Sequence, residues 1–170
     1  MAARIASTMR AGAVAVVALA LADGAVPAAS AGGVGRGPCT AAQTRQVAGA
    51  FARAWTAGDT RALARLVAGE PHFRWVSAAP PGGRSGARAF DRASLAAFIR
   101  ARHAQHEHLT LTSFKFNGSD LRGSEGFGHF EFTAARSADD WPAGMDSERA
   151  GKGAIICTVT RPMLAVWSLG

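Results

Sequence analysis

Two histidine-bearing stretches carry the side chains best suited to chemistry. Residues 103–108 read HAQHEH, which places three of the five histidines and one glutamate within six positions. His129 and Glu131 lie two positions apart in GFGHFEF, residues 126–132, and this spacing puts both side chains on one face of a strand. Imidazole titrates near neutral pH and a nearby carboxylate can orient it, so His129 and Glu131 are the candidate acid–base pair.

The alternation of the same segment also supports a simpler interpretation. Phe130 and Phe132 alternate with His129 and Glu131. If burial directs the phenylalanines into the core, the histidine and the glutamate face solvent. If a partner subunit packed on the polar face, His129 and Glu131 would be covered and not exposed to solvent. The sequence therefore leaves both alternatives open.

The HAQHEH stretch does not match a known zinc motif. His103 and His106 have the i, i+3 spacing that places two side chains on one helix face, but a zinc site needs at least a third ligand. The HExxH pattern that begins at His106 fails at Thr110. We therefore expect no metal ion and no cofactor, and we interpret the stretch as the polar end of a helix, where histidines interact favourably with free carbonyls.

The first 31 residues have the organisation of a secretory signal peptide. Arg4 and Arg10 precede an apolar run at residues 11–22, and the sequence ASA at 29–31 supplies the small residues of a cleavage site. The apolar run is too short to cross a bilayer core of about 30 Å. We expect export from a bacterial cell, with residues 1–31 removed and no membrane span in the mature protein.

The two cysteines, Cys39 and Cys157, allow one intramolecular disulfide. Exported proteins meet oxidising conditions, so we predict this bond, with two buried free thiols as the alternative. Residues 32–39 form a glycine-rich lead-in, and residues 40–170 form one domain that is long enough to bury its own core.

The chain is basic, with a formal net charge of +7. Such a charge favours anionic partners. The arginines are scattered, however, without the basic stripe and interleaved aromatic residues that mark a nucleic-acid surface. No nucleic-acid partner is predicted.

Local signals predict helices first and strands later along the chain. Thr40, Asp59 and Asp91 are N-cap residues for three helices, and residues 73–77 have strand character between the second and third helix.

Four segments of the second half alternate apolar and polar residues, as strands of a half-buried sheet do. They are residues 109–117, 126–136, 153–160 and 163–169. NGSD at 117–120 predicts a turn, and residues 138–151 are predicted to form a long loop. The fold class is therefore α+β, with three helices packed on one curved antiparallel β-sheet.

The segment FARAWTAGDTRALARL, residues 51–66, resembles the nuclear transport factor 2-like superfamily. A long helix, an Ala-Gly-Asp break and a short leucine-bearing helix are typical of that superfamily, and the order of the elements agrees as far as Leu169. The resemblance implies a cone-shaped fold with an apolar cavity between helices and sheet. It also implies frequent dimers, so we expect a homodimer.

The resemblance does not extend to the known catalytic sets. The chain has no tyrosine, whereas ketosteroid-isomerase-like relatives place a Tyr hydroxyl opposite an Asp base, and scytalone-dehydratase-like relatives also depend on tyrosines. FRWVS at residues 73–77 offers no carboxylate where the base would be expected.

The expected function is therefore binding of a small apolar molecule or a protein partner in the cone cavity, without catalysis. Aromatic residues are the candidates for lining that cavity. They are Phe51, Trp55, Trp75, Phe98, Phe130 and Phe132. The alternatives are a lyase, isomerase or cyclase-type enzyme that uses His129 and Glu131, and a structural dimer in the cell envelope.

Overall fold

The computed structural model describes residues 38–79, 87–123, 125–142, 148–157 and 161–170. The predicted signal peptide and nearly all of the lead-in lie outside the described residues. Within these ranges, no helix has the length and apolar character needed to cross a membrane.

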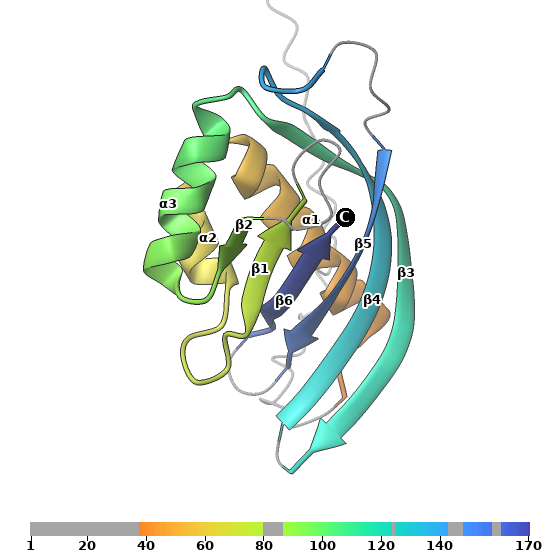
Figure 1. Cartoon of the computed structure of the whole chain (residues 1–170). Helices are drawn as coiled ribbons and strands as arrows, with labels where there is room; N and C mark the ends of the chain where they lie inside the picture. Colours follow the sequence, from red (N-terminus) through yellow and green to blue (C-terminus); the bar gives the residue numbers. More distant parts are fainter. Residues whose placement is uncertain (1–37, 80–86, 124, 143–147, 158–160) are drawn as a thin grey trace, which may run out of the picture. The chain divides into compact units, whose positions relative to one another are not determined.

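Three helices and six strands make up the described domain (Figure 1). The helices are α1 (Ala41–Thr56), α2 (Thr60–Leu66) and α3 (Arg92–His103). The strands are β1 (Trp75–Ala78), β2 (Ala87–Ala89), β3 (His108–Arg122), β4 (Glu125–Ser137), β5 (Glu148–Ile156) and β6 (Met163–Leu169). Strands β3 and β4 are long and bend along their length, which curves the sheet (Figure 1). The predicted α+β class is confirmed.

Side-chain caps begin all three helices at the predicted residues. The Thr40 hydroxyl accepts from the Gln43 backbone N–H at 3.2 Å, and Gln43 Oε1 accepts in return from the Thr40 N–H at 3.0 Å. Asp59 accepts from the Ala62 N–H at 2.8 Å, and Asp91 caps α3 in the same way. These bonds satisfy backbone donors that have no partner inside the helix.

The six strands form one sheet in the order β2-β1-β6-β5-β4-β3. Neighbouring strands are antiparallel, except that β1 and β6 run parallel. Along β4, Phe130 and Phe132 are buried in the core cluster, whereas Glu131 is exposed and His129 is half-buried. We call the side that carries Phe130 the helix face and the side that carries His129 the outer face.

Two glycines of β5 make room for the aromatic core. Gly153 is paired with Phe130 and Gly151 with Phe132. A Cβ added at Gly151 would lie 2.2 Å from Phe132 Cζ, and one added at Gly153 would lie 2.4 Å from Phe130 Cζ. The two phenyl rings therefore lie directly over the neighbouring strand, where any side chain would displace them.

The structure corrects two element boundaries and adds one strand. The predicted turn at 117–120 is wrong, because β3 continues through it to Arg122; Gly118, with φ of 105°, lies at an irregularity in the β3–β4 register. Strand β5 begins at Glu148, inside the predicted loop, and the short strand β2 was not predicted. Residues 158–160 of the predicted strand lie outside the described residues.

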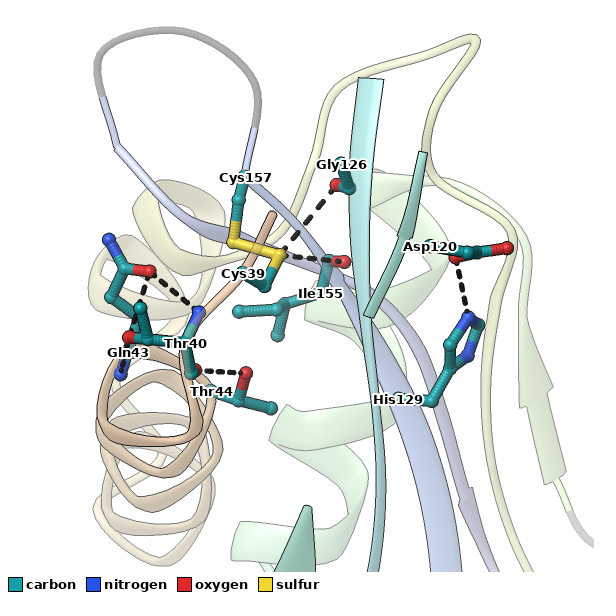
Figure 2. Close-up of a disulfide and its surroundings, with 9 residues drawn as sticks. All are labelled: Cys39, Thr40, Gln43, Thr44, Asp120, Gly126, His129, Ile155 and Cys157. Atoms are coloured by element: carbon teal, nitrogen blue, oxygen red, sulfur yellow. Dashed lines mark hydrogen bonds and ion pairs between the residues drawn. A yellow bond between two sulfur atoms is a disulfide. The ribbon is translucent and has the colours of Figure 1, made fainter. Parts of the chain in front are cut away.

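The predicted disulfide between Cys39 and Cys157 is confirmed, with the two Cα atoms 5.4 Å apart. It joins the chain just before α1 to the end of β5 (Figure 2). Gly128 of β4 faces it, and a Cβ there would lie 2.7 Å from Cys39 Cβ. The bond closes a sequence separation of 118 residues, which in the chain-entropy model stabilises the fold by about 4–5 kcal/mol.

Candidate functional site

Five of the six predicted cavity aromatics lie in one cluster on the helix face. They are Phe51, Trp55, Phe98, Phe130 and Phe132. All except Phe98 are at most 3% exposed. Together with Phe114 and Trp167 they form ring pairs whose centroids lie 4.1 to 6.2 Å apart. Rings at these separations are in direct contact, so these aromatic residues pack against one another inside the domain.

The sixth aromatic residue, Trp75, lies on the other side of the sheet. Its strand neighbour Val76 is paired with Trp167, and both are fully buried on the helix face. Because adjacent residues of a strand point to opposite faces, Trp75 belongs to the outer face with its partner Val166. Grouping Trp75 with the interior aromatics was therefore wrong.

The histidines of HAQHEH do not share a helix face. Helix α3 ends at His103, and His106 follows with a positive φ of 48°. His106 Nδ1 instead lies 2.6 Å from Asp139 Oδ2, in an exposed pair. The described residues contain no group of three or more side chains that could hold a metal ion.

The buried member of HAQHEH is its glutamate. Glu107 is 1% exposed and accepts from Arg136 Nε at 2.6 Å and from Arg136 Nη2 at 3.3 Å. Arg136, 2% exposed, also donates to the backbone oxygen of Ala79 at 2.6 Å. Arg102 Nε donates to the second oxygen of Glu107. The carboxylate therefore joins the end of α3, the end of β4 and the chain after β1.

Arg102 extends this network to the segment that follows β4. Its two Nη atoms lie 2.7 and 2.8 Å from the two carboxylate oxygens of Asp140. The hydrogen bonds from Arg102 hold the pKa of Asp140 below its usual value, and the Asp140 carboxylate in turn raises the pKa of Arg102. Next along the chain, the ring of Trp141 lies 5.4 Å from Arg136 Cζ and 5.0 Å from Arg149 Cζ. These contacts tie the segment after β4 to α3, to β4 and to β5.

His129 lies in a pocket of about 330 Å³ on the outer face, which we call the His129 pocket. Its apolar residues are Phe127, Ala154, Ala165, Val166 and, at the base, Phe130 of the helix face. Its charged residues are Arg74, Arg122, Glu131 and Lys152. An apolar floor bordered by a few polar groups is the usual composition of a small-molecule site.

Cross-strand register brings these residues together. One row across the sheet runs through directly paired residues on the outer face. It consists of Trp75, Val166, Ala154 and His129. The next row is polar and consists of Ser77, Ser168, Lys152, Glu131 and Lys115. Directly paired side chains on one face lie about 4.5–5.5 Å apart, so four strands contribute to one site.

The partner of His129 is Asp120, not Glu131. His129 Nε2 lies 2.9 Å from Asp120 Oδ1, on the side of β4 away from the disulfide (Figure 2). Arg122 Nε donates to the other oxygen of Asp120 at 3.1 Å. These two bonds, first that to His129, hold the pKa of Asp120 below its usual value. Glu131 shares the outer face, as its spacing predicted, but forms a 3.8 Å ion pair with Lys115.

Solved structures with the same fold cover most of the chain. A candidate dehydratase of the NTF2-like family from Streptomyces avermitilis aligns over 75% of this chain and 92% of its own length, at 15% identity and a TM-score of 0.54. A protein of unknown function with a cystatin-like fold from Nostoc punctiforme aligns over 78% and 93%, at 9% identity and a TM-score of 0.55.

The chain has the nuclear transport factor 2-like fold, as predicted from its resemblance to that superfamily. No family model and no curated protein matches the sequence. At these identities the structural likeness extends to the fold alone, and function has to be argued from the site.

Proposed function

We propose that the protein is a small-molecule binding domain whose site is the His129 pocket on the outer sheet face. The observation that carries this proposal is the composition of the pocket: Phe127, Ala154 and Val166 form an apolar floor beside Arg74 and Lys152. The predicted binding function is kept, but its location moves from the interior to the outer face. The interior aromatic rings touch one another, so a ligand placed among them would displace buried rings.

A fragment screen by NMR on the isotope-labelled protein tests this placement. We expect bound fragments to shift the backbone signals of Phe127, His129 and Ala154. Val166→Trp should fill the pocket and abolish these shifts. Arg88→Trp is the matched control, because Arg88 lies on the outer face opposite Ser77 and outside the pocket. Circular dichroism checks that both variants fold.

Two outcomes contradict the placement. Fragments that bind equally well to the Val166→Trp variant do not occupy the pocket. Shifts confined to the indole N–H signals of Trp55 and Trp167 support a site inside the domain. That alternative has one observation in its favour, because neither indole Nε1 has a hydrogen-bond partner in the described part of the chain, and an interior ligand would supply an acceptor.

The second candidate is an enzyme in which His129 transfers a proton, now with Asp120 in place of Glu131 as its orienting carboxylate. The 2.9 Å contact from Asp120 to Nε2 favours it, because a carboxylate on one imidazole nitrogen fixes the tautomer and leaves the other nitrogen to act as base. The reaction class is proton transfer at carbon, as in an isomerase or lyase.

Hydrogen–deuterium exchange in a bound carbon acid tests the enzymatic alternative. In D₂O, catalysis predicts exchange of a ligand C–H that is lost in His129→Gln and reduced in Asp120→Asn. Arg88→Gln is the control and should leave exchange unchanged, because Arg88 lies on the outer face but outside the pocket. Exchange that survives in His129→Gln excludes this role.

The expected homodimer would compete with ligand if the second copy packed on the outer face. Its half-buried apolar residues Trp75 and Val166 favour such packing. Sedimentation over a range of concentrations measures the dimer, and a dissociation constant that is unaffected by Val166→Glu argues against this face.

We also propose that the protein acts outside the cytoplasm. The Cys39–Cys157 disulfide supports this, because such bonds persist in oxidising compartments. N-terminal sequencing of the mature protein should begin at Gly32. Recovery of the protein from the cytoplasmic fraction with residues 1–31 still attached would contradict export.

A further inference from the structure

We infer that the ligand of the His129 pocket is an organic carboxylate, whose acidic group is bound by Arg74 and Lys152 and whose apolar part lies over the pocket floor. The inference rests on the proposed function of this pocket and specifies its ligand class. It differs from the small apolar molecule expected from the resemblance, because the site now has a charge.

The acids near the pocket already have basic partners. Asp120 accepts from His129 and Arg122, and Glu131 pairs with Lys115. Their negative charge is therefore balanced without Arg74 or Lys152.

Among the described residues, neither of the two remaining cations forms an ion pair, although Lys152 lies opposite Glu131 in the strand register. Arg74 Nη1 donates to the backbone oxygen of Pro71 at 2.8 Å, and Lys152 forms no ion pair in the part of the chain that the structure describes. Both side chains line the pocket. A carboxylate would supply the charge-assisted hydrogen bonds that neither backbone nor neighbouring acids provide.

The apolar residues that line the same pocket fix the ligand's second requirement. Arg74 immediately precedes Trp75, which pairs with Val166, and Lys152 belongs to the adjacent polar row. An inorganic anion would leave in contact with water the exposed surface of Val166 and the part of Phe127 that Arg122 does not cover. An aliphatic or aromatic body would cover this surface, and its removal from water favours binding.

Three probes separate charge from apolar contact: octanoate, octan-1-ol and inorganic phosphate, each titrated by NMR at low and high salt. We expect octanoate to shift the signals of the pocket residues, with octan-1-ol and phosphate each about tenfold weaker or worse. High salt should weaken octanoate binding and leave octan-1-ol unaffected.

Variants that change one charge at a time test whether positive charge in the pocket favours octanoate binding. Arg74→Gln and Lys152→Gln should each weaken octanoate about three- to tenfold, and Glu131→Gln should strengthen it by removing a negative charge. Arg88→Gln is the control and should have no effect, because Arg88 lies on the outer face opposite Ser77 and outside the pocket.

The outcomes distinguish this inference from the proposed function. If octan-1-ol binds as tightly as octanoate at the same residues, the pocket is a binding site and the carboxylate inference is wrong. If inorganic phosphate binds as tightly as octanoate, the ligand needs no apolar body, and the inference of an organic ligand is wrong. If none of the probes shifts the pocket signals, the inference fails, and the fragment screen then decides whether the pocket binds any ligand at all.

Discussion

Replacing Glu107 by Gln should destabilise the fold more than replacing any exposed carboxylate. Glu107 is 1% exposed and Arg136 is 2% exposed, and the two side chains are joined by bonds of 2.6 and 3.3 Å. Glutamine keeps the size of the side chain and one acceptor oxygen. It removes the charge that compensates the buried guanidinium of Arg136.

The size of the expected loss in stability follows from the contacts that Arg102 and Arg136 each retain in the Glu107→Gln variant. Arg102 retains its two bonds to the Asp140 carboxylate, whereas Arg136 retains a single backbone acceptor and the face of Trp141. Removing one partner of a buried pair costs about 3–5 kcal/mol. Because the Gln oxygen preserves one hydrogen bond, we expect a loss of about 2–4 kcal/mol in the free energy of unfolding.

Urea denaturation measures this loss, with Glu131→Gln as the matched control. Glu131 is exposed and pairs with Lys115 at 3.8 Å, so its replacement should change the free energy of unfolding by less than about 1 kcal/mol. The double variant Glu107→Leu with Arg136→Met should be more stable than Glu107→Leu alone, because it leaves no unpaired charge. A loss below about 1 kcal/mol for Glu107→Gln would refute the reasoning.

Three further predictions concern stability. Replacing Cys39 and Cys157 by Ser should lower the free energy of unfolding by about 2–5 kcal/mol; an unchanged urea midpoint would contradict the disulfide's role. Gly153→Ala should destabilise the fold by about 1–3 kcal/mol, since its Cβ would lie 2.6 Å from a backbone oxygen. Gly49→Ala inside α1 should instead stabilise the fold by about 0.5–1 kcal/mol. Thermal melts in which both variants shift the melting temperature in the same direction would refute this. The pKa of Asp140 is lowered in the folded state, so its carboxylate contributes stability above the unfolded-state pKa, and that stability is lost as pH falls through the folded-state pKa. Asp140→Asn should therefore flatten the loss of stability in acid, as measured by thermal melts from neutral to acidic pH. An unchanged acid profile would refute this.

Features that depend on local chemistry were predictable from the sequence. The N-caps Thr40, Asp59 and Asp91 act within four residues of their partners, and the inward direction of Phe130 and Phe132 follows from alternation alone. The packing of these rings over β5 was not predictable, because it depends on which residues of β5 lie opposite them, and that requires the strand register.

HAQHEH illustrates the limit of judging residues by type. The histidines drew attention as ligands, yet the buried residue is Glu107, whose partner Arg136 lies 29 positions away. No local pattern connects them. A lone glutamate between the end of a helix and the start of a strand was the available signal, since a charged residue at such a junction needs a partner if the junction is buried.

Asp120 was missed because one signal has two structural meanings. NGSD at 117–120 is typical of a turn, and a turn there would end the strand before Asp120. The structure instead uses Gly118, with φ of 105°, at a register shift within β3, so that the strand continues to Arg122. Because glycine accommodates positive φ in bulges as readily as in turns, the sequence alone did not separate the two. Because the strand continues, Asp120 pairs with Phe127 and lies diagonally across from His129. Its Oδ1 atom is then 2.9 Å from His129 Nε2. The location of one hairpin turn thus decides whether His129 is an isolated surface histidine or the oriented member of a site.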